Sequence, residues 1–162
     1  MIQLQKLLVP TDFSEFSNHA LRYGCEFAKR FGAQLHLLHV MDASLTMPDP
    51  IMGAPVSDAE LNDLQNRAAT AIEDLPESDW LIGIDHVKRV IQIGSPFVEI
   101  IRYAKQQEID MIVLGTHGRT GLAHVLIGST AERVIRKAPC PRRFDLRHDC
   151  QPITDRCAIL QT

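Results

Sequence analysis

Short apolar runs alternate with amphipathic segments along most of this chain. Each apolar run has the length and the content of branched aliphatic residues that are typical of a strand buried in a parallel sheet. We predict such strands at residues 5–9, 33–40, 86–94 and 110–115. In the other segments, apolar residues recur every three or four positions, as in helices that pack on one face. We predict these helices at residues 14–32, 57–75, 96–107 and 129–139.

The alternation of strands and helices predicts the fold class. Strands that are each followed by a helix favour an α/β fold, with a parallel sheet covered by helices on both faces. The length of 162 residues suits one domain with its own core. Residues 41–57 contain three prolines and keep no periodicity, so we expect a long loop there.

The predicted helix ends carry the residues that helix ends favour. Ser14 can cap the first helix, and Gly32 can end it. Ser57 and Ser129 each stand three residues before a glutamate, which is the capping-box pattern. Pro96 follows a serine, and proline is favoured at the first helical position. Inside the first helix, an apolar stripe with helical spacing is formed by Phe16, Ala20, Tyr23 and Phe27.

Composition and charge exclude several classes of protein. The net charge of −3 argues against a nucleic-acid-binding protein, which would normally have a basic face. No apolar run approaches the roughly 20 residues of a membrane span. The N-terminus has the pattern of a strand and not that of a signal peptide, so we expect a cytoplasmic protein without a membrane partner. The four cysteines match no zinc-site spacing, and we interpret them as free thiols.

The stretch GTHGRTGLAHVLIGST, residues 115–130, is the strongest candidate for chemistry. It contains four glycines and no acidic residue, and it lies between a predicted strand and a predicted helix. Glycines let backbone N–H groups approach a ligand, and a helix N-terminus attracts anions. The stretch is therefore either a phosphate-binding loop or a glycine-rich turn before an ordinary capped helix. It is neither a P-loop nor a G-x-G-x-x-G dinucleotide fingerprint.

Asp12 is the second candidate, at the end of the first strand. Its carboxylate can accept hydrogen bonds from a ribose hydroxyl or an adenine amine, or it can cap the following helix. In an open parallel sheet, ligands bind beyond the carboxyl ends of the strands where the strand order reverses. If the first and fourth strands are neighbours, Asp12 and the glycine stretch meet in one crevice.

These residues carry a family resemblance. Gly115, Gly118 and Gly128 followed by Ser129 match the G-2x-G-9x-G-[ST] pattern of the ATP-binding branch of the universal stress protein family. The opening KLLVPTDFSEFSNHAL and the closing IGSTAERVIRKAPCP are similar to the first and last parts of that family's domain. The resemblance covers residues 1–141 and leaves 142–162 as an atypical C-terminal tail.

The resemblance implies a fold, a ligand and a set of ligand-binding residues. The implied fold is a Rossmann-like, doubly wound, five-stranded sheet of order 3-2-1-4-5, commonly in a homodimer. The implied ligand is ATP, ADP or AMP, and any Mg²⁺ or Mn²⁺ would be held mainly through the phosphates. Residues expected around the nucleoside, with Val40 contacting adenine through its backbone, are Pro10, Thr11, Asp12, Val40, Leu114 and Gly115. Residues expected around the phosphates are His117, Gly118, Arg119, Gly128, Ser129 and Thr130.

The composition of residues 115–130 argues against efficient phosphoryl transfer. Such an enzyme needs a positioned metal ion and an oriented nucleophile. No acidic residue lies between positions 115 and 131 to hold a metal ion or to orient a nucleophile. We therefore assign no catalytic residue. We expect a nucleotide-binding regulatory protein of the stress response with at most slow ATP hydrolysis. The alternatives are an ATPase or transferase that uses the same crevice, and an interaction protein whose crevice binds no nucleotide.

The C-terminal tail departs from the family pattern. Arg142 and Arg143 follow PCP, where the family has a short apolar strand that completes the sheet and often pairs two subunits. A half-exposed strand at residues 143–147 and a substitute strand at 157–160 are both compatible with the sequence, as is a disordered end. The homodimer is therefore an expectation from the resemblance alone.

Overall fold

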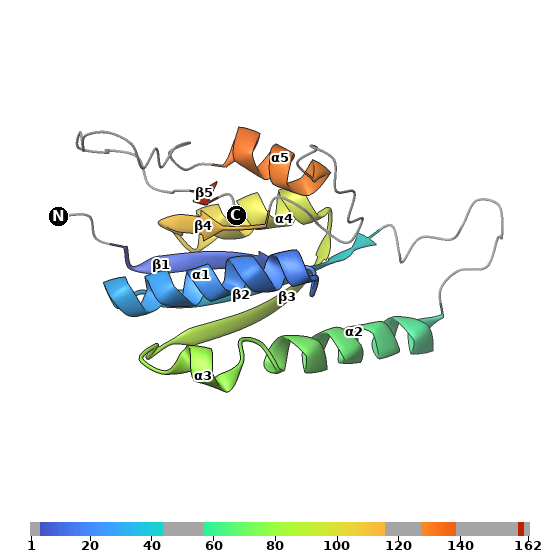
Figure 1. The fold of residues 1–162 in the computed structure, drawn as a ribbon. Helices are drawn as coiled ribbons and strands as arrows, with labels where there is room; N and C mark the ends of the chain where they lie inside the picture. Colours follow the sequence, from blue (N-terminus) through green and yellow to red (C-terminus); the bar gives the residue numbers. More distant parts are fainter. Residues whose placement is uncertain (1–3, 44–56, 116–127, 139–158, 161–162) are drawn as a thin grey trace.

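The fold is a parallel β-sheet with helices on both faces (Figure 1). The structure is a computed structural model, and it describes residues 4–43, 57–115, 128–138 and 159–160. The strand order is β3-β2-β1-β4-β5, and every neighbouring pair is parallel. This is the predicted order, with the first and fourth strands side by side. The strands are β1 (Lys6–Thr11), β2 (Gln34–Asp42), β3 (Val87–Gly94), β4 (Met111–Val113) and β5 (Ile159–Leu160).

The helices enclose two separate hydrophobic cores. Side chains of α1, α2 and α3 pack with one face of the sheet, around Leu7 and Leu35. Side chains of α4 and α5 pack with the other face, around Leu8 and Leu38. The helices are α1 (Glu15–Phe31), α2 (Asp58–Glu73), α3 (Ser78–Leu81), α4 (Pro96–Gln106) and α5 (Ser129–Lys137). The short helix α3 was not predicted, since four residues carry no usable periodicity.

The strand β5 comes from the C-terminal tail. It pairs with β4 through Ile112↔Ile159 and Val113↔Leu160. Of the alternatives left open by the sequence, this is the substitute strand at residues 157–160. The other alternative, a strand at 143–147, lies outside the described residues, as does the loop expected between residues 44 and 56.

Two details of the predicted elements are corrected. The first strand does not end before Pro10 but continues to Thr11, and Pro10 pairs with Leu38 of β2. This is tolerated because the described pairing of β1 with β4 stops at Leu8, so Pro10 faces no ladder partner on that side. The stripe predicted for α1 is buried only in part: Phe16 and Tyr23 remain 44% and 43% exposed, whereas Ala20 is buried and Phe27 packs against the core.

Small residues of α1 face the sheet because the helix lies very close to it. A Cβ atom added at Gly24 would come within 2.5 Å of Val9 Cγ2. Large aromatic rings cannot fit into that space and lie beside it. The caps of α1 are those predicted: Ser14 Oγ accepts from the N–H of Ser17, and Gly32 ends the helix with φ of 62°. The capping box of Ser57 and Glu60 is also confirmed.

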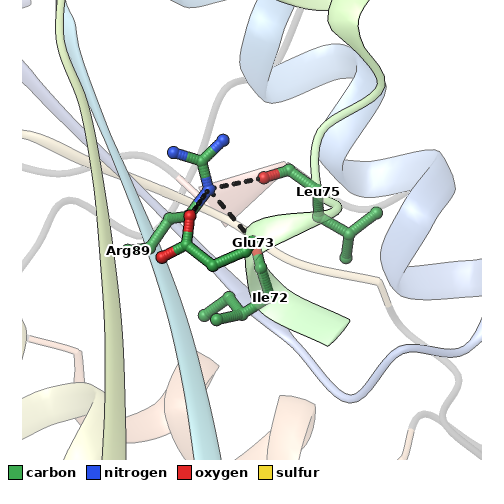
Figure 2. Close-up of polar contacts among 4 residues, drawn as sticks. All are labelled: Ile72, Glu73, Leu75 and Arg89. Carbon is green, nitrogen blue, oxygen red and sulfur yellow. Dashed lines mark hydrogen bonds and ion pairs between the residues drawn. The ribbon is translucent and has the colours of Figure 1, made fainter. Parts of the chain in front are cut away.

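Arg89 of β3 fixes the C-terminal end of α2 (Figure 2). Its Nε lies 2.8 Å from the carbonyl oxygen of Leu75 and 3.2 Å from that of Ile72. The carboxylate of Glu73 lies 3.8 Å from the same nitrogen. The last carbonyls of a helix lack partners within the helix, and a cation is favoured there. Arg89 therefore holds α2 against the edge of the sheet.

His36 of β2 is a buried, neutral histidine in the second core. Its Nδ1 lies 2.9 Å from the hydroxyl of Tyr103, and its Nε2 lies 3.1 Å from Oε1 of Gln34. An amide oxygen can only accept, so Nε2 carries the proton and Nδ1 accepts from the tyrosine hydroxyl. Burial lowers the pKa of His36 from 6.5 to about 4, with smaller contributions from Lys88 and Lys6.

We expect Arg89→Gln to lower the free energy of unfolding by about 1–3 kcal/mol, because the carbonyls of Ile72 and Leu75 lose a charged donor in a partly buried position. Arg67→Gln is the control, since Arg67 pairs with Asp63 on the exposed surface of α2 and its side chain is 75% exposed. Loss of this exposed ion pair should lower the free energy of unfolding by less than about 1 kcal/mol. Urea unfolding measures both variants. Equal effects would show that Arg89 does not anchor the helix.

We expect His36 to make the protein acid-sensitive. Because its pKa in the folded state is below the ordinary 6.5, the stabilising contribution is complete above pH 6.5 and is lost as the pH falls towards 4. The loss amounts to about 2–3 kcal/mol. In urea titrations over this pH range, His36→Gln, which does not titrate, should lose correspondingly less stability than the wild type. Parallel pH profiles would refute the assignment.

Candidate functional site

A cleft of about 680 Å³ opens at the carboxyl ends of the strands. Its walls come from the residues at and just after the ends of β1, β2 and β4, from one side of α2, and from the first residues of α4 and α5. All strands are parallel, so their carboxyl ends lie at the same edge of the sheet. This is also where the strand order reverses between β1 and β4, which is the usual position of a ligand site in such folds.

The cleft brings together nine of the twelve residues predicted from the sequence. These are Pro10, Thr11, Asp12, Val40, Leu114, Gly115, Gly128, Ser129 and Thr130. The other three, His117, Gly118 and Arg119, lie outside the described residues. The nine come from four separate segments of the chain, so their convergence follows from the topology of the sheet and not from closeness in sequence.

Most of the predicted residues lie on the α4 and α5 side of the sheet. Side chains alternate between the two faces of a strand, so Pro10 lies on the same face as Leu8. Val40 and Leu114 pack against the core formed with α4 and α5. Thr11 is the exception: it faces α1, where its hydroxyl lies 3.2 Å from that of Ser17. Its side chain therefore supports the turn after β1.

The turn after β1 is held by Asp12 itself. Its Oδ1 accepts hydrogen bonds from the backbone N–H of Ser14, at 3.1 Å, and from the Ser14 hydroxyl. Ser14 is in turn the N-cap of α1. Phe13, between them, has φ of 64°, which is uncommon for a residue other than glycine. One of the two roles considered for Asp12, the local one, is thus observed.

Gly115 is required by packing, whatever its role toward a ligand. A Cβ atom there would lie 2.9 Å from the carbonyl oxygen of Phe16 and 3.1 Å from its carbonyl carbon. The chain leaving β4 therefore passes directly against the backbone of the first turn of α1. Only glycine allows this approach without a backbone shift, and the approach keeps the exits of β1 and β4 adjacent.

The N-terminus of α5 faces the cleft. The capping box expected at Ser129 is not formed: Gly128 is the N-cap, and no side chain of the described residues caps the helix by a hydrogen bond. Because Ser129 is the first helical residue, its hydroxyl is not in a capping position. The acidic residue of the first turn, Glu132, is exposed and pairs with Arg136 at 2.7 Å. The first N–H groups of α5 therefore present a partial positive charge that favours an anion.

Several lining residues were missed from the sequence. On the α1 and α2 side, the cleft is lined by Phe13, His39, Met41, Leu64, Arg67, Ala68 and Ala71. The helical stripe of α2 was recognised, but only as a packing face. His39 is buried, and its Nδ1 donates to the carbonyl of Thr11 at 2.8 Å, while its ring lies 4.3 Å from that of Phe13. These contacts bind the ends of β1 and β2 together.

The charged groups of the cleft are few and mixed in sign. Among the described residues that line it, they are Asp12, Asp42 and Arg67. In the described part of the chain, histidine, cysteine and carboxylate side chains form no group of three that could hold a metal ion. The described helices also include none that is long and apolar enough to cross a membrane. The cleft is thus an apolar-walled site with hydrogen-bonding groups at the β1 exit and at the start of α5.

Comparisons with known proteins agree on one family. The family model described as the universal stress protein family matches residues 3–142. Universal stress protein MJ0531 of Methanocaldococcus jannaschii is 34% identical over 137 residues, which cover 85% of this chain and 79% of that protein. The solved structure of MJ0577 has a TM-score of 0.74 at 27% identity and covers 99% of this chain and 98% of that one.

Two more distant structures share the fold and contain nucleotides. A universal stress protein in complex with cAMP has a TM-score of 0.57 at 20% identity, covering 99% of this chain and 98% of that one. The universal stress protein of Archaeoglobus fulgidus in complex with dAMP has a TM-score of 0.53 at 20% identity, covering 85% and 94%. At these identities the likeness establishes the fold of the present chain and nothing further.

We expect Gly115→Ala to lower the free energy of unfolding by about 1–3 kcal/mol, because its methyl group would clash with the backbone of Phe16. It should also speed amide hydrogen exchange in the first turn of α1. Gly32→Ala is the comparison: its Cβ would meet open space, and its cost comes only from a φ of 62°. It should leave exchange in that turn unchanged. If amide hydrogen exchange in the first turn of α1 is as slow in Gly115→Ala as in the wild type, the packing role of Gly115 is contradicted.

Proposed function

This chain belongs to the universal stress protein family, and on that premise we propose that it holds ATP in the cleft and acts as a nucleotide-binding regulatory protein of the stress response. The observation that carries the proposal is the meeting of the Asp12 turn and the uncapped N-terminus of α5 in one cleft of about 680 Å³. This size falls within the range of small-molecule sites, and the two ends of the cleft differ in chemistry as the two ends of a nucleotide do.

The phosphates would bind at the start of α5. Backbone N–H groups of Gly128, Ser129 and Thr130 would donate to phosphate oxygens, helped by the helix dipole and by the two hydroxyls. His117, Gly118 and Arg119 belong to the same proposed phosphate site. Any divalent ion would be held mainly by the phosphates, since the described lining residues of this end include no carboxylate.

The nucleoside would bind over the exits of β1, β2 and β4. Pro10, Leu114 and Val40 would supply apolar contact, and the backbone of Val40 would meet the adenine. Thr11 and Gly115 would shape the pocket through the turn and the close approach that they support. Asp12 would accept a hydrogen bond from the nucleoside through its carboxylate, which also holds the turn at Ser14. The cAMP and dAMP complexes of two proteins with this fold support an adenine nucleotide as the ligand class.

We propose that hydrolysis is slow or absent. Phosphoryl transfer needs a group that orients the attacking water near the terminal phosphate. Asp12 lies at the nucleoside end of the proposed pose and is engaged in the turn. ATP would then act by favouring one conformation or one assembly. The alternative, an ATPase, predicts single-turnover hydrolysis well above that of a Gly118→Ala and Asp12→Ala double variant; an interaction protein predicts no bound adenine nucleotide after purification.

The remaining family traits are also proposals for this chain. They are homodimerisation, a cytoplasmic location, and a division into a nucleotide-binding domain at residues 1–141 with a tail at 142–162. The pairing of β5 with β4 supports a structural role for the end of that tail in completing the sheet.

We expect Asp12→Asn to weaken ATP binding by roughly tenfold or more while changing stability little. Asparagine keeps an oxygen for the N–H of Ser14 but loses the charge that strengthens a hydrogen bond to the ligand. Asp12→Ala should weaken binding and also destabilise the turn by about 1 kcal/mol. Isothermal titration calorimetry with ATP and thermal unfolding separate the two effects.

Asp110→Asn is the matched control. Asp110 is also a carboxylate that accepts backbone N–H groups, those of Gln5 and Lys6 at 2.9 and 3.0 Å, but at the amino end of the sheet. It should leave the ATP affinity unchanged. If Asp12→Asn binds ATP as tightly as the wild type, Asp12 serves only to hold the turn after β1. If the wild-type protein does not bind ATP, the proposed function is refuted.

A further inference from the structure

Gln92 is a polar residue on an otherwise apolar part of the nucleotide face. It lies on β3 and pairs in register with Val40 of β2. Register partners in neighbouring parallel strands share a face, so Gln92 points to the same side of the sheet as Val40. The preceding residue on that face, Val90, packs with Val40 in the core formed by α4 and α5. A branched aliphatic residue would therefore suit position 92.

The side-chain oxygen of Gln92 is buried and has no hydrogen-bond partner in the part of the chain that the structure describes. Among the described residues, the one other side-chain atom in this condition is Oδ1 of Asn18, on α1. Buried polar groups in native proteins nearly always have a partner, and an unmet one carries a free-energy penalty that calls for an explanation. The residue as a whole is only partly buried.

Gln92 lies beside the nucleoside end of the proposed site. Its register partner Val40 lines the cleft, as does Pro96 four residues further along the chain, whereas Gln92 is next to this lining and not part of it. Strands β3 and β4 are three spacings apart in the sheet, which is roughly 14 Å. A nucleotide with its phosphates at the start of α5, beyond β4, would extend its base toward β2 and β3.

We propose that Gln92 recognises the adenine base, with its carboxamide turning into the cleft when the base binds. Its Oε1 accepts from the exocyclic amino group of adenine, and its Nε2 donates to a neighbouring ring nitrogen. A glutamine side chain can form such a two-point pair with adenine. The base supplies the partner that the buried oxygen lacks, and Gln92 becomes a determinant of base specificity. This inference rests on the proposed function and adds a residue to it.

The test compares ATP with purine riboside triphosphate, which has the same ring and phosphates but lacks the amino group. The wild type should bind ATP roughly tenfold more tightly than the analogue, since a site built to hydrogen-bond a group rejects the ligand that lacks it. In Gln92→Leu, the ATP affinity should fall roughly tenfold and the affinity for the analogue should stay the same. Isothermal titration calorimetry measures all four affinities.

Two controls separate recognition from structure. Gln106→Leu changes an exposed glutamine of α4 and should preserve the preference for ATP. The melting temperature of nucleotide-free Gln92→Leu should not fall, because the substitution removes an unpartnered buried oxygen. An equal loss of affinity for both ligands, or no loss for either, would overturn the role of Gln92. Failure of the wild type to bind ATP would instead overturn the proposed function.

Discussion

The site depends on one constraint, the close contact between the exits of β1 and β4. In a parallel sheet all carboxyl ends share an edge, but only neighbouring strands deliver their following residues to the same place. Here Gly115 passes against the backbone of Phe16, and Gly24 lets α1 settle onto β1. These two close approaches fix the start of α1 relative to β4. The Asp12 turn and the chain that leads to α5 meet because of them.

The groups at this edge serve the fold and the cleft together. Asp12 holds the N-cap of α1 through one oxygen, and His39 joins β2 to β1 through the carbonyl of Thr11. The N-terminus of α5 differs, because no side chain in the described part of the molecule caps it. A helix end of this kind gains most from an external anion. One wall of the cleft is thus satisfied internally, whereas the other is completed by a ligand in the function proposed above.

Local chemistry explains which parts of the fold were predictable from the sequence. The first four strands, four of the helices and the caps at Ser14, Gly32 and Ser57 follow from periodicity and from single-residue preferences. The strand order came from the family resemblance, since periodicity does not specify which strands are neighbours. The buried face of α1 was predicted only in part: Phe16 and Tyr23 were included with Ala20, but the short distance between α1 and β1 leaves room there only for small residues such as Ala20 and Gly24.

The site was predictable to the extent that its residues lie at the ends of strands. Pro10 and Thr11 end β1, Asp12 follows it, Gly115 comes two residues after β4, and all four line the cleft. The wall formed by α2 and the anchoring of that helix by Arg89 depend on tertiary contacts, which no local sequence pattern indicates. The absence of a capping hydrogen bond at Ser129 was also hidden, because the capping-box pattern is present in the sequence and goes unused.

A crystal structure of the protein grown with ATP tests the central claim most directly. We predict that the adenine lies beside Val40 and Asp12 and that the phosphates lie on the N–H groups of Gly128, Ser129 and Thr130. A nucleotide bound away from this edge of the sheet, or one whose phosphates point toward α2 and Arg67, would contradict it.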